Sequence, residues 1–566
     1  MILIFISWIY ILFTTINLGF LTDKVLRLKN QNFVITSILG LFSATILASI
    51  WAIFGRINIE FHVFLLFLNI LLIVLFRNPI FDIYKLFIFE FKQLQKSLKI
   101  VLILISILIV AQCASVPFVI DNESYYIQTI KWLNEYGFVK GLVNLHLFLG
   151  QTSGWHITQS VFNFSFLYKN FNDLSGFCLL LGNIFSIQKL NEYYKNDNKN
   201  YLIIGLFPIF NIFFFQFISA PSPDIPVYVF SFIFFFYFLE NFKKITPEIF
   251  NLIVILVLFL LYIKNTTLTF AIFPVILLAL HFKTLSRQLL KPILLATLVL
   301  SVFVIKNMII CGSPIFPSKI FTSLTTSYSI PDSIEGFYYD QIKYYGFFIT
   351  AKQYSLMSNY DLLLQWISMP KLNGLFNKIA VLLILIVPFF IFKFQNKKAI
   401  WTLYFIMVLQ LLLLFVTSPQ YRFFMNFILF FSLFCLICVL QNKKMIQALL
   451  IISLVPTFIV LFLPVNLNHF SNHKFMLEIS NFSFKNIVFP YKNTKNNTAF
   501  TTVKLGNLKY NSPINNEFFW ANGDGDLPCV NKEQIEYFEK YFNTIPQMRT
   551  NDLKDGFYAK QLSGNE

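Results

Sequence analysis

The sequence predicts an all-α polytopic membrane protein. Its 566 residues are 57% hydrophobic and only 13% charged, whereas soluble domains are about 45–50% apolar and about 25% charged. Many apolar runs are as long as the stretch of about 20 residues with which a helix crosses a bilayer. Because these runs are continuous rather than alternating, they exclude a membrane β-barrel.

We expect about fourteen transmembrane helices from these runs. The expected spans are residues 1–21, 32–54, 61–76, 98–120, 172–188, 201–219, 225–240, 248–264, 267–281, 292–311, 378–393, 399–417, 421–440 and 445–464. Residues 79–90 are expected to form an interfacial helix. The first 21 residues lack a basic n-region and a small-residue cleavage site, so they indicate a retained span rather than a removed signal peptide.

Basic residues in the loops predict the orientation of the chain. One alternate set of loops carries most of them, whereas the opposite short loops carry only Arg56, Lys264 and Arg422. The positive-inside rule places the basic loops in the cytoplasm. The N-terminus then lies outside, together with three long segments, 121–171, 312–377 and 465–566. The predicted organisation is a transmembrane domain of residues 1–464 and a small mixed α/β module of residues 465–566.

The net charge of +17 reflects this topology rather than nucleic-acid binding. The tail from residue 465 onward has nearly balanced charges, so the basic excess lies in the short loops between spans. The expected cytoplasmic face has no domain, and no GxxxxGK[ST] motif occurs that could cradle a nucleotide. We therefore expect no nucleic-acid partner and a function on the outer face.

Residues 124–137 of the first long segment predict a short amphipathic helix. Its apolar side chains, Tyr126 among them, recur at helical spacing, and Asp121 or Asn122 is expected to cap it. Such a helix would lie in the membrane interface with Trp132 at headgroup level. Residues 335–369 have a similar character. In the tail, residues 490–510 alternate weakly like strands, and residues 531–545 resemble a helix.

The sequence predicts no metal site. Cys435 and Cys438 form a CxxC pair, but inside an apolar helix with no partner pair. The run from Asn522 to Asp526 has the spacing of a calcium loop, but Leu527 stands where that loop needs glycine, so a polar turn is favoured. No cofactor is required, and a divalent cation between the outer carboxylates and a phosphate stays an open alternative.

Charged side chains of both signs occur at the outer ends of predicted spans. A carboxylate there can act as a general base on a hydroxyl, and a cation can hold a phosphate diester. An ionisable group inside a span costs about 2.5–3.5 kcal/mol on insertion, so a lysine there needs a reason. The candidates are Asp121, Glu123, Asp224, Lys264, Lys306 and Arg422.

Each candidate also has a structural interpretation. The carboxylates could cap helices or favour their first turns, and Lys264 and Arg422 could be snorkelling anchors. Lys306 could pair with a structural carboxylate, and His146 and His156 could be ordinary loop residues. The functional interpretation gains from the presence of both signs at one face.

Several short motifs, in this order, resemble the GT-C superfamily of integral-membrane glycosyltransferases, within a little-characterised bacterial multi-span branch. The resemblance covers roughly residues 98–440. The motifs that carry it are Asp121-Asn-Glu123 with Tyr125-Tyr126, Gly141-Leu-Val-Asn144-Leu-His146 with Ser153-Gly-Trp155, Lys306-Asn307 with Gly312-Ser-Pro314, and Pro419-Gln-Tyr-Arg422. In this chain the acidic motif follows the fourth span rather than the first, and it reads Asp-x-Glu rather than Asp-Asp or Asp-x-Asp.

The resemblance implies an inverting glycosyltransferase at the periplasmic face of a bacterial inner membrane. It implies a polyprenyl-phosphate-linked sugar as donor and a cell-envelope glycan, lipid or protein as acceptor. Asp121 or Glu123 would be the catalytic base. The implied phosphate-binding residues are Arg422, Lys264 and Lys306, and the residues expected near the acceptor or supporting the site are Asp224, His146, Asn144 and Trp155.

Three alternatives stay open from the sequence. A polymerase or ligase of lipid-linked oligosaccharide would rely on basic residues rather than on a carboxylate. A transporter or flippase would need repeats and midplane charges, which the sequence does not suggest. An assembly factor would use the tail to bind a partner.

Overall fold

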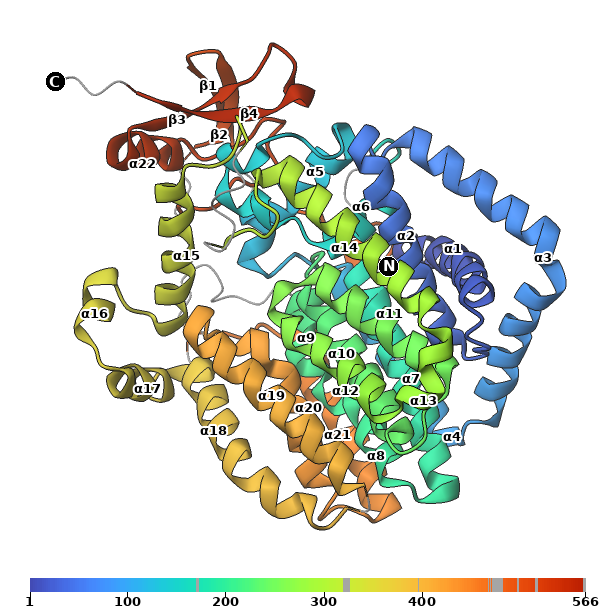
Figure 1. The fold of residues 1–566 in the computed structure, drawn as a ribbon. Coiled ribbons are helices and arrows are strands. Elements are labelled where there is room, and N and C mark those ends of the chain that lie inside the picture. The colour runs from blue at the N-terminus through green and yellow to red at the C-terminus, as the bar shows by residue number, and fades with distance from the viewer. Residues whose placement is uncertain are drawn as a thin grey trace.

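The computed structural model describes residues 1–168, 173–318, 326–394, 396–466, 468, 470, 482–495, 498–514 and 518–562. Parts of the three predicted outer segments, namely 169–171, 319–325 and several stretches of the tail from residue 467 onward, lie outside the described residues. The described chain is mostly helical, with a small region of strands near its C-terminus (Figure 1). The predicted class, a multi-span helical membrane protein with a small C-terminal module, is confirmed.

Ten stretches of the described chain are helical, long and apolar enough to cross a membrane. Nine are single helices: α1 (Ile2–Leu26), α2 (Phe33–Phe54), α3 (Ile59–Gln93), α4 (Lys96–Cys113), α10 (Asp224–Asn241), α14 (Leu290–Cys311), α18 (Lys371–Ile391), α19 (Lys397–Thr417) and α21 (Lys443–Phe462). The tenth, Lys199–Ile218, contains α8 (Lys199–Gly205) and α9 (Asn211–Ile218). The region from Asn265 to Gln288, which includes α12 (Ile272–Leu280) and α13 (Phe282–Leu285), bends by 91° and raises the number to eleven if it is one span.

The predicted number of fourteen spans is not confirmed. Three predicted spans correspond to helices that fall short in length or apolar character: α7 (Leu174–Asn196), α11 (Pro247–Ile263) and α20 (Tyr421–Leu436). The predicted interfacial helix at 79–90 is instead the second half of α3, which is kinked at Phe76. The kink lies three residues before Pro79, whose ring cannot fit against the preceding turn of a straight helix.

The first two helices pack closely because glycines face each other's backbone. A Cβ atom on Gly40 would lie 1.8 Å from the carbonyl oxygen of Thr15, and one on Gly19 would lie 1.9 Å from that of Thr36. Small residues allow such an approach between membrane helices. The side chain of Asn32 accepts hydrogen bonds from Val34 and Ile35 and so caps the start of α2.

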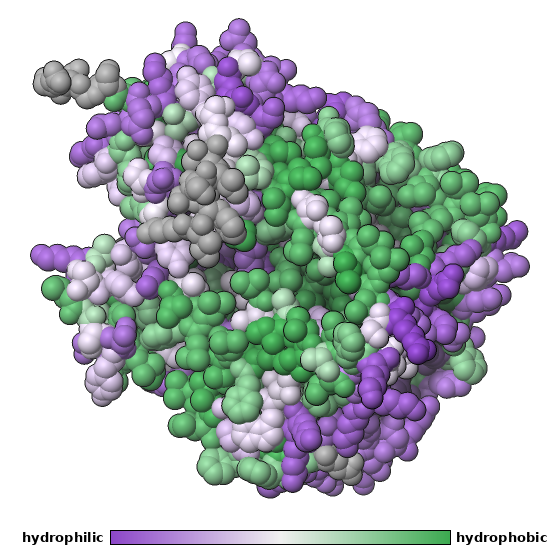
Figure 2. All heavy atoms as spheres, viewed as in Figure 1, coloured by the Kyte–Doolittle hydropathy of each residue, from purple (hydrophilic) through white to green (hydrophobic). Residues whose placement is uncertain are grey.

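A continuous apolar surface crosses the face of the molecule shown in Figure 2, with hydrophilic residues over the C-terminal module and at the opposite end. The exposed large apolar side chains include Phe67 and Val74 on α3 and Leu294 on α14. In water such an area would be an aggregation hazard, whereas in a bilayer it faces lipid. The hydrophilic ends therefore agree with a multi-pass membrane protein.

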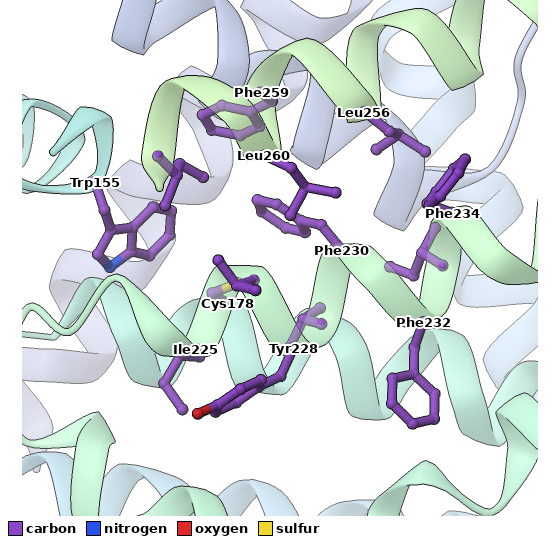
Figure 3. Close-up of a cluster of buried hydrophobic side chains, with 14 of the residues drawn as sticks. Trp155, Cys178, Ile225, Tyr228, Phe230, Phe232, Phe234, Leu256, Phe259 and Leu260 are labelled. Carbon is purple, nitrogen blue, oxygen red and sulfur yellow. The ribbon is translucent and has the colours of Figure 1, made fainter. Parts of the chain in front are cut away.

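The buried core lies between α7, α10 and α11. Figure 3 shows Phe230, Phe259 and Leu260 in this cluster, with Trp155 reaching in from the neighbouring loop helix α6 (Gly154–Val161). Tyr228 contributes its ring to the cluster, while its hydroxyl points away (Figure 3). This packing fixes the ends of α10 and α11, at which the predicted charged residues lie.

The C-terminal module combines two antiparallel hairpins with one helix, as the sequence predicts. Strands β1 (Phe500–Leu505) and β2 (Leu508–Pro513) pair with Leu505 opposite Leu508, across a two-residue turn that begins at Gly506 with φ +59°. Strand β3 (Thr544–Met548) pairs with β4 (Phe557–Gln561), and α22 (Lys532–Phe542) connects the two hairpins. The module sits over α5 (Figure 1).

The two long loops contain further helices. The first loop has a π-helical turn, η1 (Asn122–Tyr126), which continues into α5 (Ile127–Glu135). The second has α15 (Asp332–Phe347), α16 (Ala351–Leu356) and α17 (Asn359–Ile367). Trp132 is buried, and its ring packs edge-on against Phe557 of the module. The prediction that Trp132 lies at headgroup level is therefore wrong, because the module covers this helix.

Candidate functional site

The carboxylate of Asp121 is paired with the guanidinium of Arg422. Arg422 Nη1 lies 2.5 Å from Asp121 Oδ2, although 301 residues separate them in the chain. The Arg422 Nε–H also donates to Gln420 Oε1 at 3.1 Å, and Tyr228 donates to the Arg422 carbonyl at 2.8 Å. The two charged side chains are 16% and 25% exposed, so the pair is accessible at its edge.

Asp121 does not cap the helix that follows it. It precedes η1 without a side-chain hydrogen bond to the backbone of the first turn. Instead, its carboxylate faces Arg422 and lies 3.5 Å from the hydroxyl of Tyr126. The capping interpretation of Asp121 therefore has no hydrogen bond to support it.

A second ion pair joins Asp224 to Lys264. Asp224 begins α10, and Lys264 ends α11. The Asp224 side chain is only 2% exposed, so its charge depends on Lys264 for compensation. The Lys264 ammonium therefore binds a carboxylate, and the interpretation of Lys264 as a snorkelling anchor has no support here.

The ring of Phe423 connects the two ion pairs. Lys264 Nζ lies 4.2 Å from its centroid, and the guanidinium carbon of Arg422 lies 5.0 Å from the same centroid. Cations within about 6 Å of a ring face are attracted by its quadrupole. Two carboxylates and two cations therefore meet around a single aromatic side chain.

Lys306 lies deeper in α14 and is 3% exposed. Its ammonium donates to the Thr152 carbonyl at 2.5 Å and lies 5.0 Å and 5.7 Å from the ring centroids of Phe303 and Tyr262. No carboxylate of the described residues lies within 4 Å of it, so it is not part of a structural ion pair. The prediction that it could pair with a structural carboxylate is therefore wrong for this part of the chain.

His156 is buried between Lys306 and the two ion pairs. Burial is the main cause that lowers the pKa of His156 to about 3; the positive charges of Lys306 and Lys264 act in the same direction, and Asp121 acts in the opposite one. Its ring lies 4.7 Å from that of Tyr126, whose hydroxyl approaches Asp121. The structure thus brings Asp121, Lys264 and Lys306 into one electrostatic environment.

Glu123 faces the C-terminal module instead of the charged pairs. Its carboxylate accepts hydrogen bonds from Thr494 Oγ1 at 2.7 Å and from the Lys495 backbone N–H at 2.8 Å. Its own carbonyl accepts from the backbone N–H groups of Asn522 and Gly523, each at 2.9 Å. Burial raises the pKa of Glu123, and these hydrogen bonds partly offset that rise.

The turn that resembles a calcium loop also docks on the first loop. Asp524 pairs with Lys131 at 2.5 Å, and Gln128 donates to the carbonyls of Gly523 and Gly525 at 2.9 and 3.0 Å. Within the described ranges, no group of three or more His, Cys, Asp or Glu side chains is arranged to hold a metal ion. The turn is therefore a docking element.

Three residues predicted to lie near the acceptor or to support the site make hydrogen bonds or ring contacts away from the two ion pairs. Asn144 donates to the Tyr328 carbonyl at 2.8 Å, and His146, whose pKa is lowered to about 3 by burial, packs against Trp520. Both line a small cavity between the first loop and the module. Trp155 lies in the apolar core with its indole N–H on Ser175 Oγ at 3.1 Å (Figure 3). They shape the loop and the core and do not face Asp121.

The family model for the Domain of unknown function (DUF8201) matches residues 1–429 of this chain. The chain belongs to this family. No curated protein and no solved structure matches the chain. The DUF8201 range includes both members of the Asp121–Arg422 and Asp224–Lys264 pairs and Lys306, and it ends before the C-terminal module.

Sequence reasoning did not predict the contacts that connect the charged residues. Phe423 carries no charge and is one of many phenylalanines, and the sequence assigns His156 and Tyr126 no role in the site beyond that of a loop residue and part of a motif. One signal was present: Phe423 follows Arg422 directly, so both side chains begin α20. Chemically, the site offers a partly exposed carboxylate paired with Arg422 and a second ion pair at the same aromatic ring, within a largely apolar surrounding.

Proposed function

We propose that this protein is an inverting glycosyltransferase at the periplasmic face of a bacterial inner membrane. Its donor would be a sugar on polyprenyl phosphate, and its acceptor a cell-envelope glycan, lipid or protein. One observation carries the proposal: the Asp121–Arg422 pair shares Phe423 with the Asp224–Lys264 pair, so a base and phosphate-binding cations occur together. The resemblance to the GT-C superfamily supports the same assignment. In this proposal the bent region Asn265–Gln288 and the helices α7, α11 and α20 also cross the membrane, which gives the fourteen predicted spans.

In the proposed reaction, Asp121 accepts the proton of the acceptor hydroxyl. The hydroxyl oxygen attacks the anomeric carbon from the face opposite the phosphate, and the anomeric C–O bond to phosphate breaks with inversion. The bonding electrons leave with the phosphate, whose charge the cations stabilise. Arg422 holds the Asp121 carboxylate in place before binding, and its planar fork suits a phosphate equally well.

A lipid-linked oligosaccharide polymerase or ligase is the second candidate. Lys306 favours it, because a buried ammonium with no carboxylate partner among the described residues adds a further positive charge, which suits a pyrophosphate better than a monophosphate. In that reaction the cations matter more than the carboxylate. Arg422→Ala would then abolish turnover while Asp121→Asn would leave most of it, whereas the glycosyltransferase requires Asp121.

The deciding experiment uses the full chain in proteoliposomes with a panel of radiolabelled polyprenyl-phosphate sugars and isolated envelope lipids. We expect transfer from one donor, and a loss of roughly 10²–10⁴-fold in Asp121→Asn, the range that general acid–base catalysis supplies. Asp82→Asn is the matched control, since Asp82 is 65% exposed and its ion pair in the described chain is with Lys85. Movement of label across the bilayer without transfer would indicate a transporter, and an EDTA arm tests the open alternative of a divalent cation.

A further inference from the structure

His156 has a fixed tautomer. The backbone N–H of Ser153 donates to His156 Nδ1 at 3.3 Å, within a capping box at the start of α6. Nδ1 is therefore an acceptor, and in a neutral imidazole the proton must lie on Nε2. Burial and the nearby Lys306 keep the pKa of His156 at about 3, so the ring is neutral near pH 7. The side chain thus presents an N–H donor and no positive charge.

That donor has no acceptor. His156 is fully buried, and its Nε2 makes no hydrogen bond to any residue that the structure describes. A buried donor left unpaired costs about 1–3 kcal/mol, so native structures rarely contain one without a purpose. Because Ser153 fixes the ring and Tyr126 connects it to the Asp121–Arg422 pair, this donor is placed to bind an acceptor at the charged site.

The ammonium of Lys306 is in the same condition. It can donate three hydrogen bonds, and it makes one, to the Thr152 carbonyl. It is 3% exposed and lacks a carboxylate partner in the described ranges. A buried charge without compensation is strongly unfavourable, and an incoming anion would relieve it.

One short segment holds both donors at the charged site. Lys306 binds the carbonyl of Thr152, and the neighbouring Ser153 hydroxyl donates to the Ile263 carbonyl at 2.7 Å. Ile263 precedes Lys264 in the chain, so the segment is tied to the end of α11. The His156 ring centroid lies 4.7 Å from that of Tyr126, whose hydroxyl approaches Asp121 at 3.5 Å, so this segment also adjoins the proposed catalytic carboxylate.

We propose that His156 Nε2–H and the Lys306 ammonium together bind the phosphate group of the polyprenyl-phosphate donor. This rests on the proposed function and adds a subsite to it. The two groups present only donors, which excludes a cation, and a sugar hydroxyl would not compensate the ammonium. A phosphate oxygen accepts both bonds and supplies the missing charge. Inorganic phosphate and phospholipid headgroups share this chemistry, so the test separates the three sources.

Two substitutions at one position isolate the donor. His156→Asn retains an acceptor near the place of Nδ1 for the Ser153 N–H but removes the Nε2 donor. His156→Gln restores an amide N–H near the place of Nε2. Lys306→Met removes the charge at similar length. His281→Asn and Lys343→Met are the matched controls, because His281 bonds only the Phe242 carbonyl and Lys343 lies over the Tyr354 ring, away from this site.

The assay measures binding of farnesyl phosphate to the full chain in phosphatidylcholine nanodiscs, without sugar or acceptor. We expect wild-type protein to bind farnesyl phosphate and to bind farnesol, which lacks the phosphate, far more weakly. His156→Asn and Lys306→Met should each weaken farnesyl phosphate binding by roughly tenfold to a hundredfold, the value of a hydrogen bond to a charged group. His156→Gln should lose less than His156→Asn, and both control variants should bind as wild type does.

Equal affinity in wild type, His156→Asn and Lys306→Met would overturn the proposal, and so would equal binding of farnesol. If inorganic phosphate or phosphatidylglycerol nanodiscs displace farnesyl phosphate at equal concentration, its assignment to polyprenyl phosphate is overturned. Should His156→Asn fail to fold, Lys306→Met and His156→Gln carry the test. Binding through His156 with no sugar transfer from any donor would refute the proposed function alone, and transfer that needs Asp121 but not His156 would refute this subsite alone.

Discussion

Replacing Glu123 by alanine should release the C-terminal module from the first loop. The substitution removes the acceptor of the Thr494 hydroxyl and of the Lys495 N–H, bonds of 2.7 and 2.8 Å. Each buried donor left without an acceptor costs about 1–3 kcal/mol. Because the Lys495 N–H is only partly buried, we expect a total near the lower end, about 2–3 kcal/mol, which is roughly 30-fold to 150-fold in the docking equilibrium.

Hydrogen exchange of the full chain in nanodiscs measures this change directly. The amides of Asn522 and Gly523 donate to the Glu123 carbonyl only while the module is docked, so their protection should fall by the same factor. Exchange within α2, which packs against other helices, should stay unchanged. Glu60→Ala is the control, because Glu60 is an exposed partner of Arg56. Unchanged protection of these two amides in Glu123→Ala would refute the docking role.

Further outcomes follow from the same contacts. Since burial raises the pKa of Glu123, docking of the module is fully stabilised below the pKa of the free carboxyl and weakens as pH rises through the pKa of the docked state. Protection of the Asn522 and Gly523 amides, corrected for intrinsic exchange rates, should therefore be higher at roughly pH 5 than at pH 8, and Glu123→Gln should remove the difference. Asp224→Asn should lower the melting temperature, because it leaves the Lys264 ammonium unpaired, while the double variant Asp224→Asn/Lys264→Met should recover most of the loss; a double variant less stable than either single one would contradict the pairing. Arg422→Lys should retain part of the transfer activity and Arg422→Ala should not, because lysine keeps the charge and loses the fork; identical rates in the two would show that the planar contact to Asp121 and phosphate is unimportant.

Much of the fold could be predicted from apolar runs, since each expected span corresponds to a helical region. The number of spans could not be predicted, because small differences in helix length and polarity decide whether a helix counts as a span. In α7, for example, Asn183, Gln188 and Asn191 are buried against neighbouring helices, which a hydropathy average cannot show. Polar side chains such as these can hydrogen-bond to neighbouring helices inside a bundle, whereas they are unfavourable where a helix faces lipid.

The charged residues of the site could be predicted from their positions at the ends of spans, but the ion pairs that they form could not. Charge at the ends of spans identified Asp121, Lys264 and Arg422, yet only the folded chain joins residues 301 positions apart. Glu123 was ranked beside Asp121 because they are close in sequence. Residues two apart on a helix point to different sides, so one carboxylate faces Arg422 and the other faces the module. No feature of the sequence reveals which side the module covers.

The order of synthesis has a consequence for the Asp121 carboxylate. This residue leaves the ribosome early, whereas Arg422 follows 301 residues later and the Thr494 that anchors its neighbour Glu123 comes 371 residues after that glutamate. During insertion, the first loop is therefore present without Arg422 and without the C-terminal module while most of the helices are made. The Asp121–Arg422 pair can form only after α20 has been made, and the module can cover Glu123 only later, so a chain cut short in the last hundred residues would carry the charged pairs but lack the cover that holds the first loop.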